Sequence, residues 1–325
     1  VYSVKAVSKN EEFALGTETA FSGYFGDGTY VQGNDQRVFE YANKAISTER
    51  MDEALIVVMM NSTKYAGTCY MYYPSTGNYG NGASITYFPI GTDETALEQI
   101  LHHEAGGHGF SKLADEYAYE NMYEIPSYMI EQYRQQETYG WWKNADFTND
   151  PTTVKWAHFL SDPHYVNDDL GIFEGAFTYW TGAYRPTENS IMRYNTGGFN
   201  APSREAIYYR MNKLAYGEAW IYDYERFVEY DAINRKTSTS AYIPYRLPEN
   251  IEPLHAPVVI KNSWRNAKNN APTQYKSNGT TNTNVAGNRL HKASSLPQTT
   301  GIPRTLIVTG NNPTEGYMES GARIK

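Results

Sequence analysis

The sequence predicts an α/β (α+β) fold in which helices cover a sheet, and two neighbouring stretches carry this prediction. Residues 36–49, "QRVFEYANKAISTE", repeat apolar side chains at helical spacing and predict an amphipathic helix. Its apolar face consists of Val38, Phe39, Ala42, Ala45 and Ile46. Residues 54–61, "ALIVVMMN", form a continuous apolar run, which is typical of a central strand buried on both faces.

The next elements follow from glycine, proline and apolar spacing. Residues 62–82, "STKYAGTCYMYYPSTGNYGNG", interrupt β-favouring aromatics with glycine and proline, and so predict short strands and turns. Residues 94–110, "ETALEQILHHEAGGHGF", carry apolar residues at helical spacing and predict a helix. Another helix is predicted over 126–139, because proline stands at its first turn and Gly140 just beyond its end. Two more are expected within 202–232.

The C-terminal part of the chain has a different composition. From about residue 236 it is rich in Thr, Ser, Asn, Pro and Gly, so 236–325 is predicted to be an extension of unknown role. Within it, only "APVVI" at 256–260 and "TLIVT" at 305–309 resemble strands.

Composition argues against several classes of function. The 325 residues carry a net charge of -8, which disfavours nucleic acid as a partner, because a phosphate backbone attracts basic surfaces. No apolar run approaches the roughly 20 residues of a membrane-spanning helix. Cys69 is the single cysteine, so an internal disulfide and a cysteine-based metal cluster are excluded.

The same composition suits a secreted or cell-surface bacterial protein. Cysteine is scarce, whereas polar aromatic side chains are abundant, with 30 tyrosines. The opening "VYSVKAV" resembles the middle of a strand rather than a signal segment, which predicts a mature or trimmed product.

The stretch "HHEAGGHG" at 102–109 carries the functional prediction. The familiar zinc-helix pattern H-E-x-x-H sets its histidines four residues apart, whereas His103 and His108 are five apart. In a regular helix, positions i and i+5 differ by about 140° in azimuth, against about 40° for i and i+4. A one-residue π-type bulge between Glu104 and His108 would bring the histidines onto one face. We expect Gly106 and Gly107 to permit it, since each glycine otherwise costs a helix about 1 kcal/mol relative to alanine.

With that bulge, His103 and His108 can offer neutral imidazole nitrogens to one catalytic Zn²⁺, while Glu104 acts as general base. Zinc lowers the pKa of a bound water to about 7, and a nearby carboxylate can accept its proton during attack on a carbonyl. Two alternatives remain at this point. The histidines can be a surface cluster without a metal, or Glu104 and His108, four residues apart, can be the ligands.

A catalytic zinc site usually has a third protein ligand. Asp115, seven residues beyond His108 in "GFSKLADEY", can return to the metal after a turn, and its neighbour Glu116 is the alternative. The remoter options are His102, His158 and His164.

The stretch "HEAGGHGFSKLADEY" resembles the zinc helix of the IgA peptidase family of bacterial zinc metallo-endopeptidases, and the dipeptidyl-peptidase III family shares the expanded H-E-x-x-G-H spacing. Similarity to the first family continues through "GIFEGAFTYWTGAYRPTENSIMRYN" and covers most of residues 1 to about 230. The segment "SIMRY" resembles the Met-turn of the metzincins. This resemblance implies that Met192 forms an apolar floor beneath the zinc and that Tyr194 stabilises the oxyanion. The chain departs from the metzincin pattern at Ser111 and Ala114, where that pattern has a glycine and the last ligand.

The resemblance implies a metzincin-like, two-lobed metallopeptidase catalytic domain over 1–235. An upper lobe of about 1–116 would carry a twisted sheet and the zinc helix, and a lower lobe of about 117–235 the Met-turn. The substrate, an extracellular or host protein such as one of immunoglobulin type, would cross between the lobes. Strand-like residues around Tyr65 to Tyr73 could form the sheet edge with which that extended peptide pairs. Two alternatives are a non-catalytic module that binds proteins or glycans, and a zinc hydrolase acting on a non-peptide amide.

Overall fold

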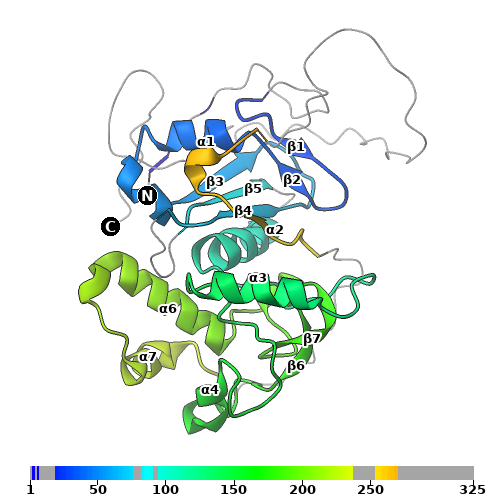
Figure 1. Cartoon of the computed structure of the whole chain (residues 1–325), viewed down its shortest axis with the longest axis vertical. Coiled ribbons are helices and arrows are strands. Elements are labelled where there is room, and N and C mark those ends of the chain that lie inside the picture. Colours follow the sequence, from blue (N-terminus) through cyan, green and yellow to red (C-terminus); the bar gives the residue numbers. More distant parts are fainter. Residues whose placement is uncertain are drawn as a thin grey trace.

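The computed structural model shows a mixed α+β protein with a sheet-bearing upper lobe and a largely helical lower lobe (Figure 1). The structure describes residues 2–3, 6, 19–75, 82–90, 94–236 and 253–269. In this part of the chain, every helix is too short or too polar to cross a lipid bilayer.

The main sheet has the strand order β3-β5-β4-β8. Its strands are β3 (Leu55–Met60), β5 (Ser84–Pro89), β4 (Thr68–Tyr72) and β8 (Val258–Ile260). β3 is parallel to β5, β4 is antiparallel to β5, and β8 is parallel to β4. The prediction of a strand over 54–61 is confirmed, but its central position is wrong. β3 lies at an end of the described sheet and alternates between buried and half-buried residues, whereas β4 and β5 are buried throughout.

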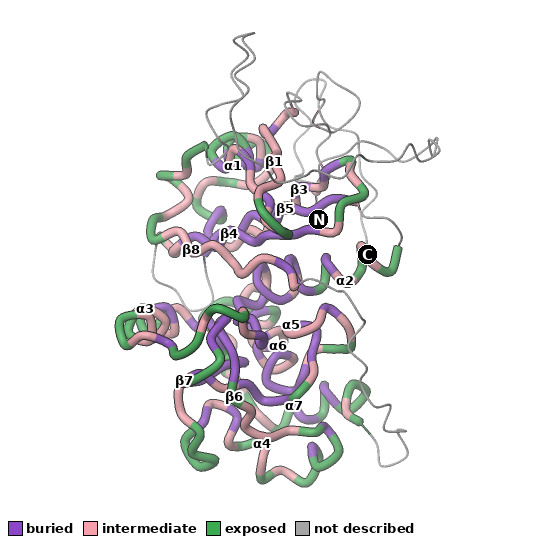
Figure 2. The backbone as a smooth tube through the Cα atoms, turned by 90° about the vertical axis from the view of Figure 1, so that its right-hand side faces the viewer, coloured by how far each residue is buried: buried purple, intermediate pink, exposed green. Residues whose placement is uncertain are grey.

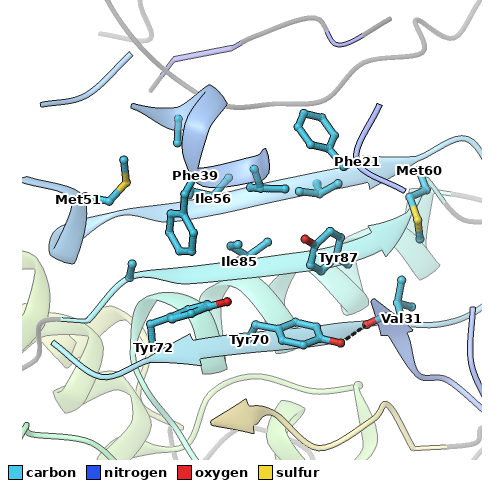
Figure 3. Close-up of a cluster of buried hydrophobic side chains, with 14 of the residues drawn as sticks. Phe21, Val31, Phe39, Met51, Ile56, Met60, Tyr70, Tyr72, Ile85 and Tyr87 are labelled. Carbon is cyan, nitrogen blue, oxygen red and sulfur yellow. Dashed lines mark hydrogen bonds between the residues drawn. The ribbon is translucent and has the colours of Figure 1, made fainter. Parts of the chain in front are cut away.

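One face of the sheet is covered by α1 (Asp35–Ala42), and a two-stranded ribbon of β1 (Tyr24–Phe25) and β2 (Val31–Gln32) lies beside it (Figure 1). The helix begins after Asn34, whose side-chain oxygen accepts the Arg37 N–H at 3.0 Å. It ends at Ala42, earlier than predicted, and the chain then turns into the 3-10 helix η1 (Thr48–Glu53). Figure 3 shows the core on this face, where Phe39 of α1 stands over Tyr72, their ring centroids 5.0 Å apart.

The other face of the sheet packs on one long helix. It begins as α2 (Glu94–Ile100) and continues as the π-helix η2 (Leu101–Phe110). Fully buried Phe88 and Ile100 lie in an apolar cluster with Ala105 and Leu254, against the half-buried face of β3. This packing explains why β3 is apolar on both sides although it lies at the end of the sheet.

The lower lobe contains the remaining helices and the hairpin β6–β7 (Figure 1). Its elements are α3 (Ser127–Glu137), α4 (Ala157–Ser161), η3 (Pro163–Tyr165), β6 (Phe173–Ala176), β7 (Tyr179–Arg185), α5 (Ile191–Tyr194), α6 (Ala201–Tyr216), η4 (Gly217–Ala219), α7 (Tyr224–Tyr230) and η5 (Asp231–Ile233). The helices predicted over 126–139 and within 202–232 are confirmed. The hairpin was not predicted.

The described part of the C-terminal extension belongs to the upper lobe. β8 confirms the strand predicted at 256–260, and η6 (Trp264–Asn266) follows it, whereas the strand predicted at 305–309 lies outside the described residues. Figure 2 shows β8 beside β4, and Tyr73 donates its N–H to the Ile260 carbonyl at 3.1 Å. The expected open edge is therefore wrong for Tyr70 to Tyr72, because these residues already pair with β8.

Candidate metal centre

His103 and His108 lie on the π-helix η2, and the π geometry decides where their side chains point. In a π-helix the hydrogen bonds join residues five apart, so residues i and i+5 are one turn apart. The Ser111 N–H donates to the Gly106 carbonyl at 3.1 Å in this way. The predicted bulge between Glu104 and His108 is confirmed, and the π geometry extends over the ten residues of η2.

The glycines of η2 permit close packing more than they loosen the helix. A Cβ atom on Gly107 would lie 2.3 Å from the Met192 sulfur, and one on Gly109 would lie 2.5 Å from the Leu55 Cδ1 atom. A Cβ on Gly106 would instead make an ordinary contact, 3.5 Å from Phe199. The expectation for Gly107 therefore acquires a steric reason, whereas no packing constraint requires glycine at 106.

Three side chains meet at one point beside η2. The His103 and His108 Nε2 atoms are 3.1 Å apart, and each lies 3.2 Å from the Asp115 Oδ1 atom. All three side chains are buried, with at most 1% of each exposed. His103, His108 and Asp115 are the one group of potential metal ligands of this kind in the described ranges.

The hydrogen bonds of the imidazoles fix which nitrogen atoms carry protons. The Nδ1 atom of His103 lies 2.8 Å from the Ile191 carbonyl, and that of His108 lies 2.8 Å from the Leu113 carbonyl. A carbonyl only accepts, so each Nδ1 carries the proton and each Nε2 presents a lone pair in the neutral ring. Two lone pairs and the Asp115 carboxylate oxygen then converge, and such a set of acceptors requires a cation between them.

A proton or a metal ion can supply that positive charge. Burial lowers the pKa of His108, but the Asp115 carboxylate outweighs this effect and raises the pKa above its usual value. Burial and the neighbouring His108 lower the pKa of His103. Burial raises the pKa of Asp115, but the two imidazoles outweigh it, His108 first, and lower the pKa to about 2. The three residues together therefore favour one shared positive charge, and a metal ion bound there would replace the shared proton.

Asp115 reaches the histidines because the chain reverses just beyond η2. Lys112 adopts a left-handed conformation with φ of 59°, which turns the backbone back toward the helix. The Asn144 side chain then fixes Ala114 by accepting its N–H at 2.8 Å and donating to its carbonyl at 2.9 Å. These bonds set the backbone from which Asp115 projects.

Glu116, the alternative ligand, faces other partners. Its carboxylate accepts hydrogen bonds from Ser190 at 2.7 Å, from Asn144 at 2.8 Å and from Asn200 at 2.9 Å. Its own N–H donates to the Met192 carbonyl at 2.9 Å. Glu116 therefore joins the turn after η2 to the segment that carries Met192, and the geometry favours Asp115 as the ligand.

Glu104 lies beside the three converging side chains and is fully buried. Neither of its carboxylate oxygens has a side-chain hydrogen-bond partner among the described residues, and the backbone of Cys69 lies near enough to lower its pKa by hydrogen bonding. A Cβ atom on Gly67 would lie 2.8 Å from the Glu104 Cγ atom and 3.0 Å from its Oε1 atom, so the backbone before β4 passes directly over this side chain. Burial raises the pKa of Glu104 to about 8, although the nearby His108 opposes the shift.

The other residues that the sequence suggested lie in different surroundings. Met192 is fully buried against Gly107, and Tyr194 follows it in α5, where its ring centroid lies 4.5 Å from the Arg193 guanidinium. The role of Tyr194 stays a prediction. His102 is exposed, whereas His158 pairs with Glu205 and His164 with Asp162, so none of these histidines joins the centre.

Sequence reasoning did not identify Tyr117 and Tyr119, which follow Asp115 at alternate positions. Burial and the negative charge of Asp115 raise the pKa of both hydroxyls, which places them near the centre. The repeated tyrosine in "DEYAY" was a signal that could have indicated them.

Comparison with known proteins does not identify a family for this chain. No protein-family model matches it, and no curated protein is similar enough to count as a match.

Proposed function

We propose that this protein is a zinc-dependent endopeptidase of the metzincin type. The single observation that carries the proposal is the convergence of three buried metal-binding atoms beside the buried carboxylate of Glu104, which has no side-chain hydrogen-bond partner among the described residues. A purely structural arrangement has no use for the Glu104 carboxylate, because burying a carboxylate with no side-chain partner is costly. A catalytic base, by contrast, must keep a lone pair available for the proton that it accepts.

The donor set and its spacing suit zinc. Bonds of about 2.0–2.1 Å in a tetrahedral arrangement place neighbouring ligand atoms roughly 3.3–3.4 Å apart. The observed separations of 3.1 and 3.2 Å are close to this value. Two imidazoles and one carboxylate leave the fourth tetrahedral position open, which is typical of catalytic rather than structural zinc sites.

Each residue of the centre would have its own role in peptide hydrolysis. Zinc, when bound by His103, His108 and Asp115, would supply Lewis acidity to water and to the scissile carbonyl. Glu104 would accept the proton of the attacking water and return it to the departing amine. Met192 would support the ligand helix from below by packing on Gly107. Tyr194 is proposed to donate to the oxyanion.

The proposal extends to substrate and location. The substrate peptide would lie in an extended conformation between the two lobes. This protein would be secreted or held at the cell surface, and it would act on extracellular or host proteins, among them those of immunoglobulin type. The net charge of -8 favours a protein substrate over nucleic acid.

Substitution of Glu104 tests the mechanism. Glu104→Gln should keep one bound zinc per chain and lower peptide hydrolysis by about 10²–10⁴-fold, the usual contribution of a general base. The measurement is zinc content together with chelator-sensitive cleavage of a mixed peptide library.

Two adjacent histidines provide matched controls. His103→Ala should lose both zinc and hydrolysis, whereas exposed His102→Ala should keep both. Full hydrolysis by Glu104→Gln would overturn the mechanism. Zinc binding without chelator-sensitive cleavage in both the parent chain and Leu254→Asp, even at high enzyme concentration, would favour the alternative of a non-catalytic binding module.

A further inference from the structure

The residues 253–260, "PLHAPVVI", belong to the upper lobe and also contact the lower lobe near the metal centre; we refer to them as the strap. On the upper-lobe side, Thr29 donates its hydroxyl to the Pro253 carbonyl at 2.9 Å, and the His255 ring lies 4.4 Å from that of Tyr30. On the lower-lobe side, Tyr117 donates to the Leu254 carbonyl at 2.6 Å. The strap is therefore bound to both lobes.

The contacts of the strap lie close to the proposed base and ligands. The residue that binds Pro253, Thr29, accepts the Gly67 N–H at 3.1 Å, and Gly67 packs on Glu104. On the opposite side, the Ala256 N–H donates at 3.0 Å to the hydroxyl of Tyr119, four residues beyond Asp115.

The strap also fills an apolar site next to the centre. Leu254 is fully buried and shares a cluster with Phe88, Ile100 and Ala105, the last of which follows Glu104 in the sequence. A leucine on a surface extension has no need of such burial. It behaves instead like the anchoring side chain of a bound peptide.

The strap ends by adding a strand to the sheet. Tyr70, Met71 and Tyr72 of β4 pair with 258–260, and in Figure 1 the gold strand β8 lies between β4 and the lower lobe. An extended peptide substrate would bind by pairing with an exposed sheet edge. The chain itself already occupies the edge of β4.

We propose that the strap is a built-in inhibitory segment that keeps the peptidase latent until it leaves the cleft. This inference rests on the proposed peptidase function, and it adds a mode of regulation to that site. The strap occupies the sheet edge and an apolar site beside Glu104, so the substrate and the strap cannot bind together. Apparent activity is then the intrinsic activity multiplied by the fraction of molecules with an open cleft.

The test compares Leu254→Asp with Asn262→Asp in the full zinc-loaded chain. The first places a carboxylate in a fully buried site of the strap, and the second places the same group at an exposed position just beyond β8. We expect Leu254→Asp to raise cleavage of a quenched fluorescent peptide library at least about tenfold, because it raises the open fraction. Asn262→Asp should behave as the parent chain does. Simple loss of folding would lower activity, so it cannot imitate this gain.

Two further measurements separate the inference from the function on which it rests. A synthetic peptide with the sequence of 253–260 should inhibit Leu254→Asp competitively, whereas a scrambled peptide should not. The release of zinc to a chelator should be faster in Leu254→Asp than in the parent chain, whether or not either cleaves peptides. Equal cleavage by Leu254→Asp and by the parent chain would overturn the inhibitory role of the strap but not the proposed peptidase function. Faster zinc release without cleavage in either chain would support the strap as a cover and overturn the peptidase.

Discussion

Alanine at Gly107 should weaken metal binding although residue 107 is not a ligand. The added Cβ atom would lie 2.3 Å from the Met192 sulfur, whereas ordinary contacts between such atoms are about 3.5–4.0 Å. Met192 or the helix must therefore move by more than about 1 Å. Any movement of Met192 reaches its neighbour Ile191, whose carbonyl accepts the hydrogen bond that orients His103.

The structure allows both effects of this substitution to be given a size. Overpacking in a core costs about 1–3 kcal/mol, and replacing a helical glycine by alanine recovers about 0.5–1 kcal/mol. Gly107→Ala should thus lower the free energy of unfolding by up to about 2.5 kcal/mol. Disturbing the partner that orients a histidine ligand typically lowers metal affinity by about 10–100-fold.

Gly106→Ala is the matched control, because its Cβ atom would lie 3.5 Å from Phe199 and needs no rearrangement. It should leave metal affinity unchanged and stabilise the protein by up to about 1 kcal/mol. The assays are competitive zinc titration against a chromophoric chelator and denaturant unfolding of the metal-free proteins. If Gly107→Ala bound zinc as tightly as the parent chain, or if both variants lost affinity equally, the packing argument would be refuted.

Three further predictions concern other contacts of the centre. Asp115→Asn should lower zinc affinity directly. Glu116→Gln should mainly destabilise the fold, by about 1–3 kcal/mol, because it places a donor amide among the donors that now bind the carboxylate. Equal zinc affinities of the two variants, measured by titration, would argue against Asp115 as the ligand. Gly67→Ala would press a Cβ atom against Glu104 and should reduce kcat while zinc content stays at the parent level, so a parent-like kcat would contradict this contact. Burial raises the pKa of the Cys69 thiol to about 12, so its thiolate is scarce below that pH. Iodoacetamide should therefore not label the native protein at pH 7–9. Rapid labelling at pH 8, measured by mass spectrometry and compared with the unfolded chain, would show that the thiol is accessible.

The local pattern of the sequence predicted the centre better than it predicted the sheet. The five-residue spacing of His103 and His108 required a widened helix, and a π-helix is what the chain forms. Asp115 was reached by a short turn from the same helix, so its place depended on neighbouring residues alone. Such information is local, and a single sequence contains it.

The features that the sequence could not reveal depend on distant partners. β4 looked like a free edge because the strand that pairs with it, β8, lies about 190 residues further along the chain. β3 looked central because both of its faces are apolar, but α2 and η2 cover one of them without adding a strand. Glu116 could not be separated from Asp115 because its partners, Asn144, Ser190 and Asn200, come from three separate segments.

The hydrogen bond between His103 and the Ile191 carbonyl has a thermodynamic consequence for the whole molecule. The imidazole belongs to the helix of the upper lobe, whereas the carbonyl belongs to the lower lobe. An ion held by this imidazole would bind more tightly while the two halves are docked, so binding and docking are linked equilibria. Because loss of an orienting partner lowers metal affinity by about 10–100-fold, saturation with the ion would stabilise the docked form by about 1.4–2.7 kcal/mol. Scarcity of the ion would then loosen the interface between the halves before either half unfolds.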